Sequence, residues 1–201
     1  MKYVSIDIET TGLDLETCQV LSIGAVIEDT NNVMPLNELP TFHGAIVSQH
    51  IAGQPYALNM NKDLIEDIVY YQTGDEHERF DLERLKGIKF YEKDQIVKAF
   101  YDFLLENGIE ADGNMVHITV AGKNFATFDL KFLERLPRWK QYIRVRQRII
   151  DPSILYTEWN IDESLPGLSK CKERCDLDPH VVHDAVEDAL DIISLLRPEY
   201  C

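Results

Sequence analysis

Basic residues are in short supply in this chain of 201 residues. It has 20 lysines and arginines against 35 aspartates and glutamates, which gives a net charge of −15. Because nucleic-acid-binding proteins usually show a basic excess, this balance argues against a broad phosphate-binding surface. One segment departs from it: residues 131–148 hold seven basic residues and the single acid Glu134. This run is either the one phosphate track of the molecule or a solvated surface.

Cysteines and long apolar runs are also scarce. There are four cysteines, Cys18, Cys171, Cys175 and Cys201. They are too few and too scattered for a disulfide scaffold, so we expect free thiols. No stretch of about 18 uncharged apolar residues is present to span a membrane, and Asp7 and Glu9 break the first apolar segment, which is unlike a signal peptide. We therefore expect a cytoplasmic protein without membrane partners.

The patterns that are present predict one α/β domain. With 45% hydrophobic residues the chain can fill one core, so we expect a single domain over residues 1–201. Three strand patterns predict an antiparallel meander, at residues 3–9, 20–27 and 41–47. Helical spacing follows at residues 57–71, 94–107, 125–136 and 185–196. Two further strands are expected at 116–120 and 148–150. This order is typical of a mixed sheet flanked by helices.

Residues 72–93 interrupt the pattern. They are rich in charge and have no clear period, so we expect an insertion or a mobile loop, and it is our candidate for setting substrate choice. Asp94, directly after it, is expected to cap the helix that follows.

Two acids end the first predicted strand. Asp7 and Glu9 are two residues apart, so both side chains leave the same face, about 6.6 Å apart at roughly 3.3 Å per residue. On most strands such a pair simply faces water. The strand that opens an α/β domain is usually central and covered on both faces, which makes these acids candidates for holding hard cations.

Two more acids fall on apolar helix faces. Asp129 lies four residues after Phe125 and four before Leu133. Asp188 lies four residues before Ile192. Burying an ionised carboxylate without compensation costs on the order of several kcal/mol. A shared metal ion would remove that cost, as would a buried arginine or a capping role for each acid.

His183 stands five residues before Asp188. On an ideal helix that spacing is about 140°, so both can face one site only if His183 lies at or before the helix start. There the positive end of the helix dipole would also favour an anionic substrate.

In this order the residues resemble the three motifs of the DEDD exonucleases, in the branch with a histidine in the third motif. The first is DIETTGL at 7–13, the second NFATFD at 124–129 and the third HDAVEDA at 183–189. The resemblance spans residues 3–196. It implies a ribonuclease-H-like fold, as in the proofreading subunit of bacterial replicative polymerase, oligoribonuclease and ribonuclease T.

The resemblance also implies a chemistry. Two Mg²⁺ or Mn²⁺ ions would be held by Asp7, Glu9, Asp129 and Asp188. Such ions lie about 3.5–4 Å apart in two-metal sites, and all-oxygen ligands suit them. His183 would be the general base that takes a proton from the attacking water. The activity implied is 3′-to-5′ hydrolysis of single-stranded nucleic acid to nucleoside monophosphates, with DNA favoured over RNA.

A substrate pocket is implied as well, made of Thr10, Thr11, Gly12, Leu13, Asn124 and Phe128. The backbone of the first three would grip the terminal 3′-OH, and the apolar residue after them would wedge against the last base. An exoribonuclease or oligoribonuclease, a polymerase or other replication partner, and any oligomeric state stay open at this stage.

Two other interpretations stay open. A zinc site has ligand types in Cys171, Cys175, His180 and His183, although its spacing is compressed. A non-catalytic nucleic-acid or protein interaction module could keep the same fold. Asp151, after the last predicted strand, is left outside the metal ligands.

Overall fold

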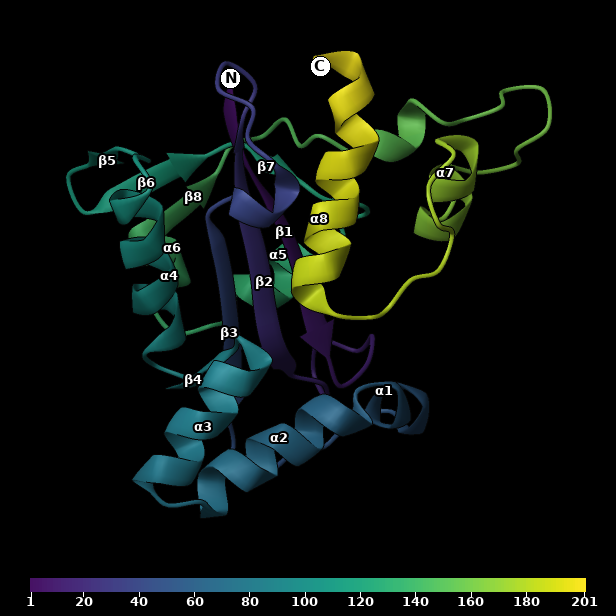
Figure 1. The fold of residues 1–201 in the computed structure, drawn as a ribbon. Coiled ribbons are helices and arrows are strands. Elements are labelled where there is room, and N and C mark those ends of the chain that lie inside the picture. Colours follow the sequence, from purple (N-terminus) through teal and green to yellow (C-terminus); the bar gives the residue numbers. More distant parts are fainter.

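A computed structural model describes the whole chain, residues 1–201. Its main sheet has five strands in the order β4-β3-β2-β1-β7 (Figure 1). They are β1 (Lys2–Thr10), β2 (Val20–Asp29), β3 (Thr41–Val47), β4 (Lys89–Glu92) and β7 (Val120–Ala121). β1, β2 and β3 form the predicted antiparallel meander, while β4 joins β3 and β7 joins β1 in parallel. A smaller sheet has the order β5-β6-β8, from β5 (Ala111–Asp112), β6 (Met115–Ile118) and β8 (Ile143–Val145).

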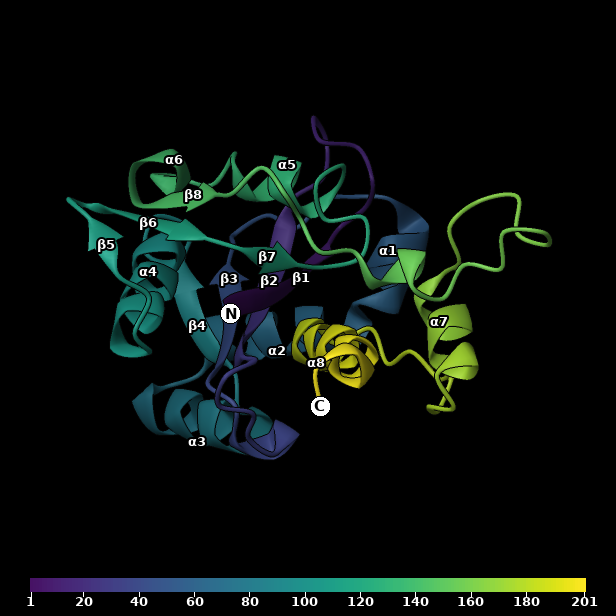
Figure 2. The same cartoon turned by 90° about the horizontal axis from the view of Figure 1, so that it is seen from above.

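The two faces of β1 belong to different cores, because side chains alternate along a strand. Val4, Ile6 and Ile8 pack in the largest hydrophobic cluster, with side chains from α4 (Ile96–Glu106) and α6 (Trp139–Tyr142). On the other face, the Ser5 hydroxyl donates to the Ala189 carbonyl in α8 (Ala185–Leu196) at 2.7 Å. Figure 2 shows α8 on one side of the sheet and α5 (Asp129–Leu133) and α6 on the other. Helix α8 therefore covers the face that carries Asp7 and Glu9, as expected for a central first strand.

Helices α1 (Pro55–Met60) and α2 (Lys62–Thr73) replace the single helix predicted over 57–71. The break is at Asn61, whose buried side chain donates to the carbonyls of Thr10 and Ala57 at 3.2 and 3.3 Å. Asn61 thereby ties the helix pair to the end of β1, and in Figure 1 both helices lie beyond that end of the sheet.

Of the two alternatives for residues 72–93, the mobile loop is wrong, while the insertion stays a prediction. The segment forms α3 (Glu76–Lys86) and then β4, an edge strand of the main sheet. The helix is defined at both ends: Asp75 and Glu78 form a capping box, and Gly87 ends it in the left-handed conformation. Only Leu82 of this helix is buried, so its charges face water and hide the helical period in the sequence.

Three other boundaries differ from the prediction. Asp94 is not the cap of α4, because that helix begins at Ile96 after Gln95 and has no side-chain cap. The helix expected at 125–136 shrinks to α5, since Asn124 is left-handed (φ 57°) and its carbonyl accepts from the Thr127 and Phe128 amides in a turn. The strand expected at 148–150 is a single bridge from Ile150 to Ala121.

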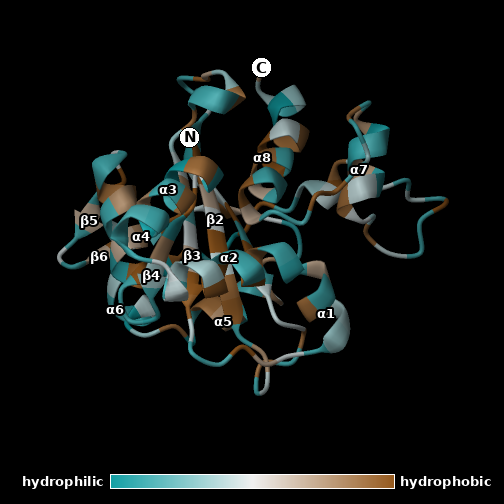
Figure 3. Cartoon of the chain, turned by 60° about the horizontal axis from the view of Figure 1, so that its bottom comes forward, coloured by the Kyte–Doolittle hydropathy of each residue, from teal (hydrophilic) through white to brown (hydrophobic).

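The remaining elements are short. They are α7 (Leu168–Arg174) and three 3-10 helices at Leu36–Glu38, Pro152–Ile154 and Arg197–Glu199. Figure 3 shows hydrophobic residues gathered in β2 and β3, and hydrophilic ones over much of the surrounding helices. None of the helices is long and apolar enough to cross a bilayer.

Candidate active site

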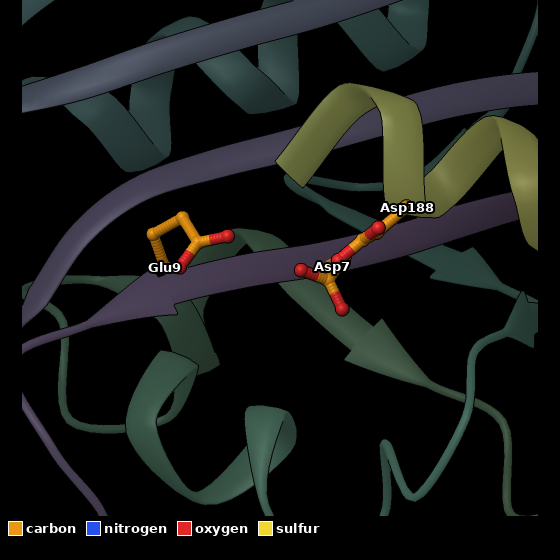
Figure 4. A group of neighbouring side chains, drawn as sticks. All are labelled: Asp7, Glu9 and Asp188. Atoms are coloured by element: carbon orange, nitrogen blue, oxygen red, sulfur yellow. The ribbon is translucent and has the colours of Figure 1, made fainter. Parts of the chain in front are cut away.

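Three carboxylates meet between β1 and α8. Asp7 and Glu9 come from β1, and Asp188 reaches them from the first turn of α8 (Figure 4). One oxygen from each lies within 4.8 Å of the others. Glu9 and Asp188 are buried and Asp7 is partly exposed, so the group opens to solvent on the Asp7 side. The same-face placement of Asp7 and Glu9 and the burial of Asp188 are both as predicted.

Asp129 lies beside this group without belonging to it. It is the first residue of α5 and is only 4% exposed, although the sequence placed it in the middle of a longer helix. Its charge is the largest electrostatic influence on Asp7 and raises the pKa of that carboxyl. The backbone amide of Ile8, between the two acids of β1, helps to keep the Asp129 carboxylate charged. Asp129 is therefore close enough to interact electrostatically with the acidic group.

The acids destabilise one another's charged forms. Burial, then the charges of Asp129, Asp188 and Glu9, raises the pKa of Asp7 well above its ordinary value. Burial and the Asp188 charge raise the pKa of Glu9 to about 8, against a hydrogen bond from Asn61 that lowers it. Burial also raises the pKa of Asp129 to about 7 and that of Asp188 to about 6, the latter with help from Asp191. Such a cluster of raised pKa values, at the mouth of a cleft, is typical of a functional site.

The donor set fits a hard divalent cation. All four groups offer carboxylate oxygens, the ligands that Mg²⁺ and Mn²⁺ prefer. The Oδ1 atom of Asp188 is buried and has no hydrogen-bond partner, which is rare for a polar atom inside a protein. A cation between Asp7, Glu9 and Asp188 would satisfy that oxygen and remove the mutual repulsion of the acids.

A cleft of about 480 Å³ runs past these acids. It is lined by Asp7, Ile8, Glu9, Thr10, Gly12, Leu13, Gln54, Tyr56, Ala57, Met60, Phe128, His183 and Asp188. Most of the residues predicted for catalysis or substrate binding are thus brought to one cavity. Leu13 and Tyr56 are 74% and 79% exposed at its edge, which leaves two apolar surfaces free for contact with a flat ligand.

Two predicted substrate residues are not in this cleft. Thr11 is fully buried, and its hydroxyl accepts from the Gln19 amide at 2.9 Å, so it closes the turn after β1. Asn124 is exposed and serves the turn before α5, with its own amide donating to Asp151 at 3.0 Å. Asp151 also accepts from Ser153, so it has a structural role outside the acidic group, where the sequence left it.

His183 directly precedes α8, where it must lie to share a site with Asp188. Asp184 caps the helix by accepting from the Val186 and Glu187 amides at 2.9 and 3.1 Å, and His183 stands before that cap with φ 58°. Its ring lines the cleft and also a second, neighbouring pocket. The histidine is thus exposed to anything bound in the cleft, which a general base requires.

Sequence reasoning missed several side chains around the cleft. The side-chain oxygen of Gln54 accepts from the Leu13 amide at 3.1 Å, and the backbone amide of Gln54 donates to the Thr11 carbonyl at 2.8 Å. Gln54 therefore holds the turn that presents Leu13. His43 of β3 lies 3.9 Å from the Asp184 carboxylate, under the start of α8. These contacts join segments far apart in the chain, and nothing in the local sequence announces them.

The zinc alternative finds no support in the geometry. The Cys171 thiol donates to the Pro166 carbonyl at 3.6 Å, and the Cys175 sulfur accepts from the Tyr156 hydroxyl at 3.1 Å. The one group of three or more potential metal ligands within reach of each other is the acidic one. All four cysteines are free thiols, as expected.

The basic run at 131–148 spans α5, α6, β8 and the segments between and after them, and none of its residues lines the cleft. Arg135 pairs with Glu16 at 3.1 Å and Lys140 with Glu134 at 2.9 Å. No lysine or arginine lines the cleft itself.

With this site in place, the fold can be compared with solved structures: it is a ribonuclease-H-like α/β fold, with a mixed sheet flanked by helices. Two similar solved structures are both of E. coli exonuclease I. One is a zinc-bound complex with single-stranded DNA (TM-score 0.59, 14% identity), and the other a complex with a 5cy-dT13 oligonucleotide (TM-score 0.58, 13% identity). Each similarity covers 98% of this chain and 40% of the exonuclease I chain. No family model and no curated protein matches the sequence.

Proposed function

We propose that this chain is a metal-dependent 3′-to-5′ exonuclease of the histidine-containing DEDD branch, built as a single domain. It would release nucleoside monophosphates from single-stranded nucleic acid. The observation that carries the proposal is the meeting of Asp7, Glu9 and Asp188 in one cleft with His183, beside a fourth buried acid at Asp129. Single-stranded DNA is the favoured substrate because the similar structures are exonuclease I with that ligand. The comparisons give no support for a polymerase partner.

The four carboxylates would hold two Mg²⁺ or Mn²⁺ ions. When bound, such ions supply Lewis-acid stabilisation for the attacking and leaving oxygens of a phosphodiester. The chain's own residues do the rest. His183 accepts the proton of the attacking water, and the exposed side chains of Leu13 and Tyr56, with the partly buried Phe128, hold the terminal base by contact with its flat faces. Stacking of this kind is tolerant of sequence, so we expect little base preference.

Release of mononucleotides from a labelled single strand tests the proposal. With Mn²⁺ present, a 3′-labelled DNA 20-mer should lose its label as a mononucleotide, and EDTA should stop the reaction. Asp7→Asn should remove the activity, because it takes a charge from the centre of the acidic group. Asp112→Asn changes an exposed acid on β5 and should leave the rate unchanged.

The substrate class is tested in the same assay by comparing DNA, RNA and dinucleotides at fixed Mn²⁺. DNA should be hydrolysed fastest. Absence of hydrolysis from all three, with Mg²⁺ as well as Mn²⁺, would show that the chain is not an exonuclease and would favour the interaction module.

A further inference from the structure

The backbone at His183 has no hydrogen bond of its own and is held only by contacts of the residues before and after it. Residues 181–183 form no backbone hydrogen bond, and His183 itself has the left-handed φ of 58° that few residues other than glycine adopt. Nothing local therefore fixes where the imidazole stands. Its position depends on the two points where this segment is next tied to the body of the protein.

The tie on the C-terminal side is the start of α8. Asp184 caps the helix through the Val186 and Glu187 amides, and its carboxylate faces His43 across 3.9 Å. This end is anchored to the same helix that carries Asp188.

The tie on the N-terminal side is a buried lysine. Lys172 of α7 donates from Nζ to the His180 carbonyl at 2.6 Å and to Asp191 Oδ2 of α8 at 2.6 Å. Its side chain is only 8% exposed. One ammonium group thus joins α7, the segment before His183 and the helix that bears Asp188.

We propose that Lys172 is a positioning residue for His183, an inference that rests on the proposed exonuclease function. A buried ion pair is seldom more stable than apolar residues of the same volume, so stability alone gives little reason for a lysine here. What an apolar side chain cannot do is hold the His180 carbonyl. Without that bond, the nearest hydrogen bond on the N-terminal side is the local one from the His180 amide to Asp178 at 3.0 Å. Residues 181–183 are then tied to the body of the protein only through Asp184, and the imidazole is free to move away from the reacting water.

The same lysine could act on Asp188 instead, because its charge lowers the pKa of that carboxyl. A double-mutant comparison separates the two routes. If Lys172 acts through His183, its removal changes nothing once His183 is gone. If it acts through Asp188 and bound metal, its removal costs the same factor in either background.

The experiment compares Lys172→Met in the wild-type chain and in His183→Ala. In the wild-type chain we expect kcat to fall about 10- to 100-fold, the scale of a misplaced catalytic group, with KM and the Mn²⁺ dissociation constant within about twofold. In His183→Ala the same change should alter the residual rate less than about twofold. Lys172→Arg, which keeps the donors, should restore most of kcat. Lys170→Met is the matched control, because Lys170 is an exposed residue of the same helix paired with Glu173 at 2.7 Å.

NMR relaxation of the backbone provides a readout that needs no activity. The order parameters of the amides of residues 181–183 should be lower in Lys172→Met than in Lys170→Met. Wild-type kcat in Lys172→Met, or an equal loss in both backgrounds, overturns the positioning role. Should the methionine variant not fold, Lys172→Ala, which also lacks a donor, takes its place under the same criteria. If the wild-type chain hydrolyses nothing, the proposed function fails, and unchanged order parameters would then reject the anchoring as well.

Discussion

At the scale of single residues, folding without metal favours the protonated forms of the four acids, whereas metal binding favours their charged forms. Without metal, the folded chain retains protons that the unfolded chain releases near pH 4, because the pKa of Asp188 is about 6, that of Asp129 about 7 and that of Glu9 about 8. The stability contributed by these raised pKa values is fully present below about pH 4 and is lost as the pH rises through 6 to 8. The acidic group therefore lowers the stability of the folded chain at neutral pH unless a cation is bound.

The first prediction follows from the upward direction of these pKa shifts. In EDTA, the Tm of the protein should fall between pH 6 and pH 8.5, and Mn²⁺ should reverse the fall, because ligands must be deprotonated to bind. At pH 8.5 in EDTA, Asp7→Asn should raise Tm by about 2–4 °C, the effect of roughly 1 kcal/mol in a chain of this size. Mn²⁺ should stabilise this variant far less than the wild type. Calorimetry at three pH values checks both; a Tm in EDTA that rises with pH would contradict the raised pKa values.

His183 gives the second prediction. His183→Ala should slow hydrolysis about 10²–10⁴-fold, because a positioned general base contributes that much. Binding of Mn²⁺, followed by titration calorimetry, should stay within about twofold of the wild type because the histidine is outside the acidic group. A variant that loses metal affinity along with rate would place His183 among the ligands.

At the scale of elements, the site depends on how closely α8 approaches the sheet. Gly24 of β2 has no side chain, and a Cβ built there would lie 2.2 Å from the carbonyl carbon of Ala185 and 2.5 Å from the Val186 amide. His43 pairs with Gly24 on the next strand and faces Asp184 from below. The first turn of α8 therefore rests directly on the backbone of the sheet.

The third prediction is that Gly24→Ala damages the site more than the fold. The clash is with backbone, so α8 must shift, at a cost of about 1–3 kcal/mol. Asp188 and His183 move with it, and we expect activity to fall at least about 100-fold. Gly167→Ala is the control: a Cβ there meets nothing within 4 Å, and the change at this helix cap should cost under about 1 kcal/mol. Unfolding curves and rates for both variants provide the comparison; an active Gly24→Ala enzyme would mean that the helix start is more adaptable than its packing indicates.

The elements also show how much of the fold could be predicted from the sequence. β3 and α8 have the predicted bounds because each has a regular apolar period and clear ends. α3 and β4 were missed because one buried residue in a charged helix leaves no period to read. Likewise Asp129 and Asp188 were visible as charges on apolar helix faces, and Asp7 and Glu9 as a pair of acids on one face of the first strand. Gln54, His43 and Lys172 instead act through contacts with other segments of the chain.

At the scale of the whole molecule, the net charge of −15 and the composition of the cleft point the same way. Lys86 lines the pocket beside the cleft and is committed to Asp67 at 2.8 Å, and Lys172 is committed to Asp191 at 2.6 Å. Five bases of the 131–148 run form no ion pair, but they line no part of the cleft: Lys131, Arg138, Arg144, Arg146 and Arg148. Phosphate contacts at the site should therefore come from bound cations and backbone amides.

The salt dependence of kcat/KM distinguishes a site that binds phosphates through cations and backbone amides from one that binds them through basic side chains. The affinity of a single strand falls with a log–log slope of about −0.7 for each phosphate neutralised by a basic side chain. With no basic side chain in the cleft, and one such contact at most outside it, kcat/KM on a DNA 20-mer should fall no more than about threefold between 50 and 200 mM KCl, at fixed Mn²⁺. If all five free bases of the run held phosphates, the fall would be roughly 100-fold. Replacing Arg144, Arg146 and Arg148 together by Gln should then leave kcat/KM and its salt slope unchanged. A steep slope that this triple variant flattens would mean that the substrate leaves the cleft along the basic run, and that the local charge of the sequence outweighs the net charge of the molecule.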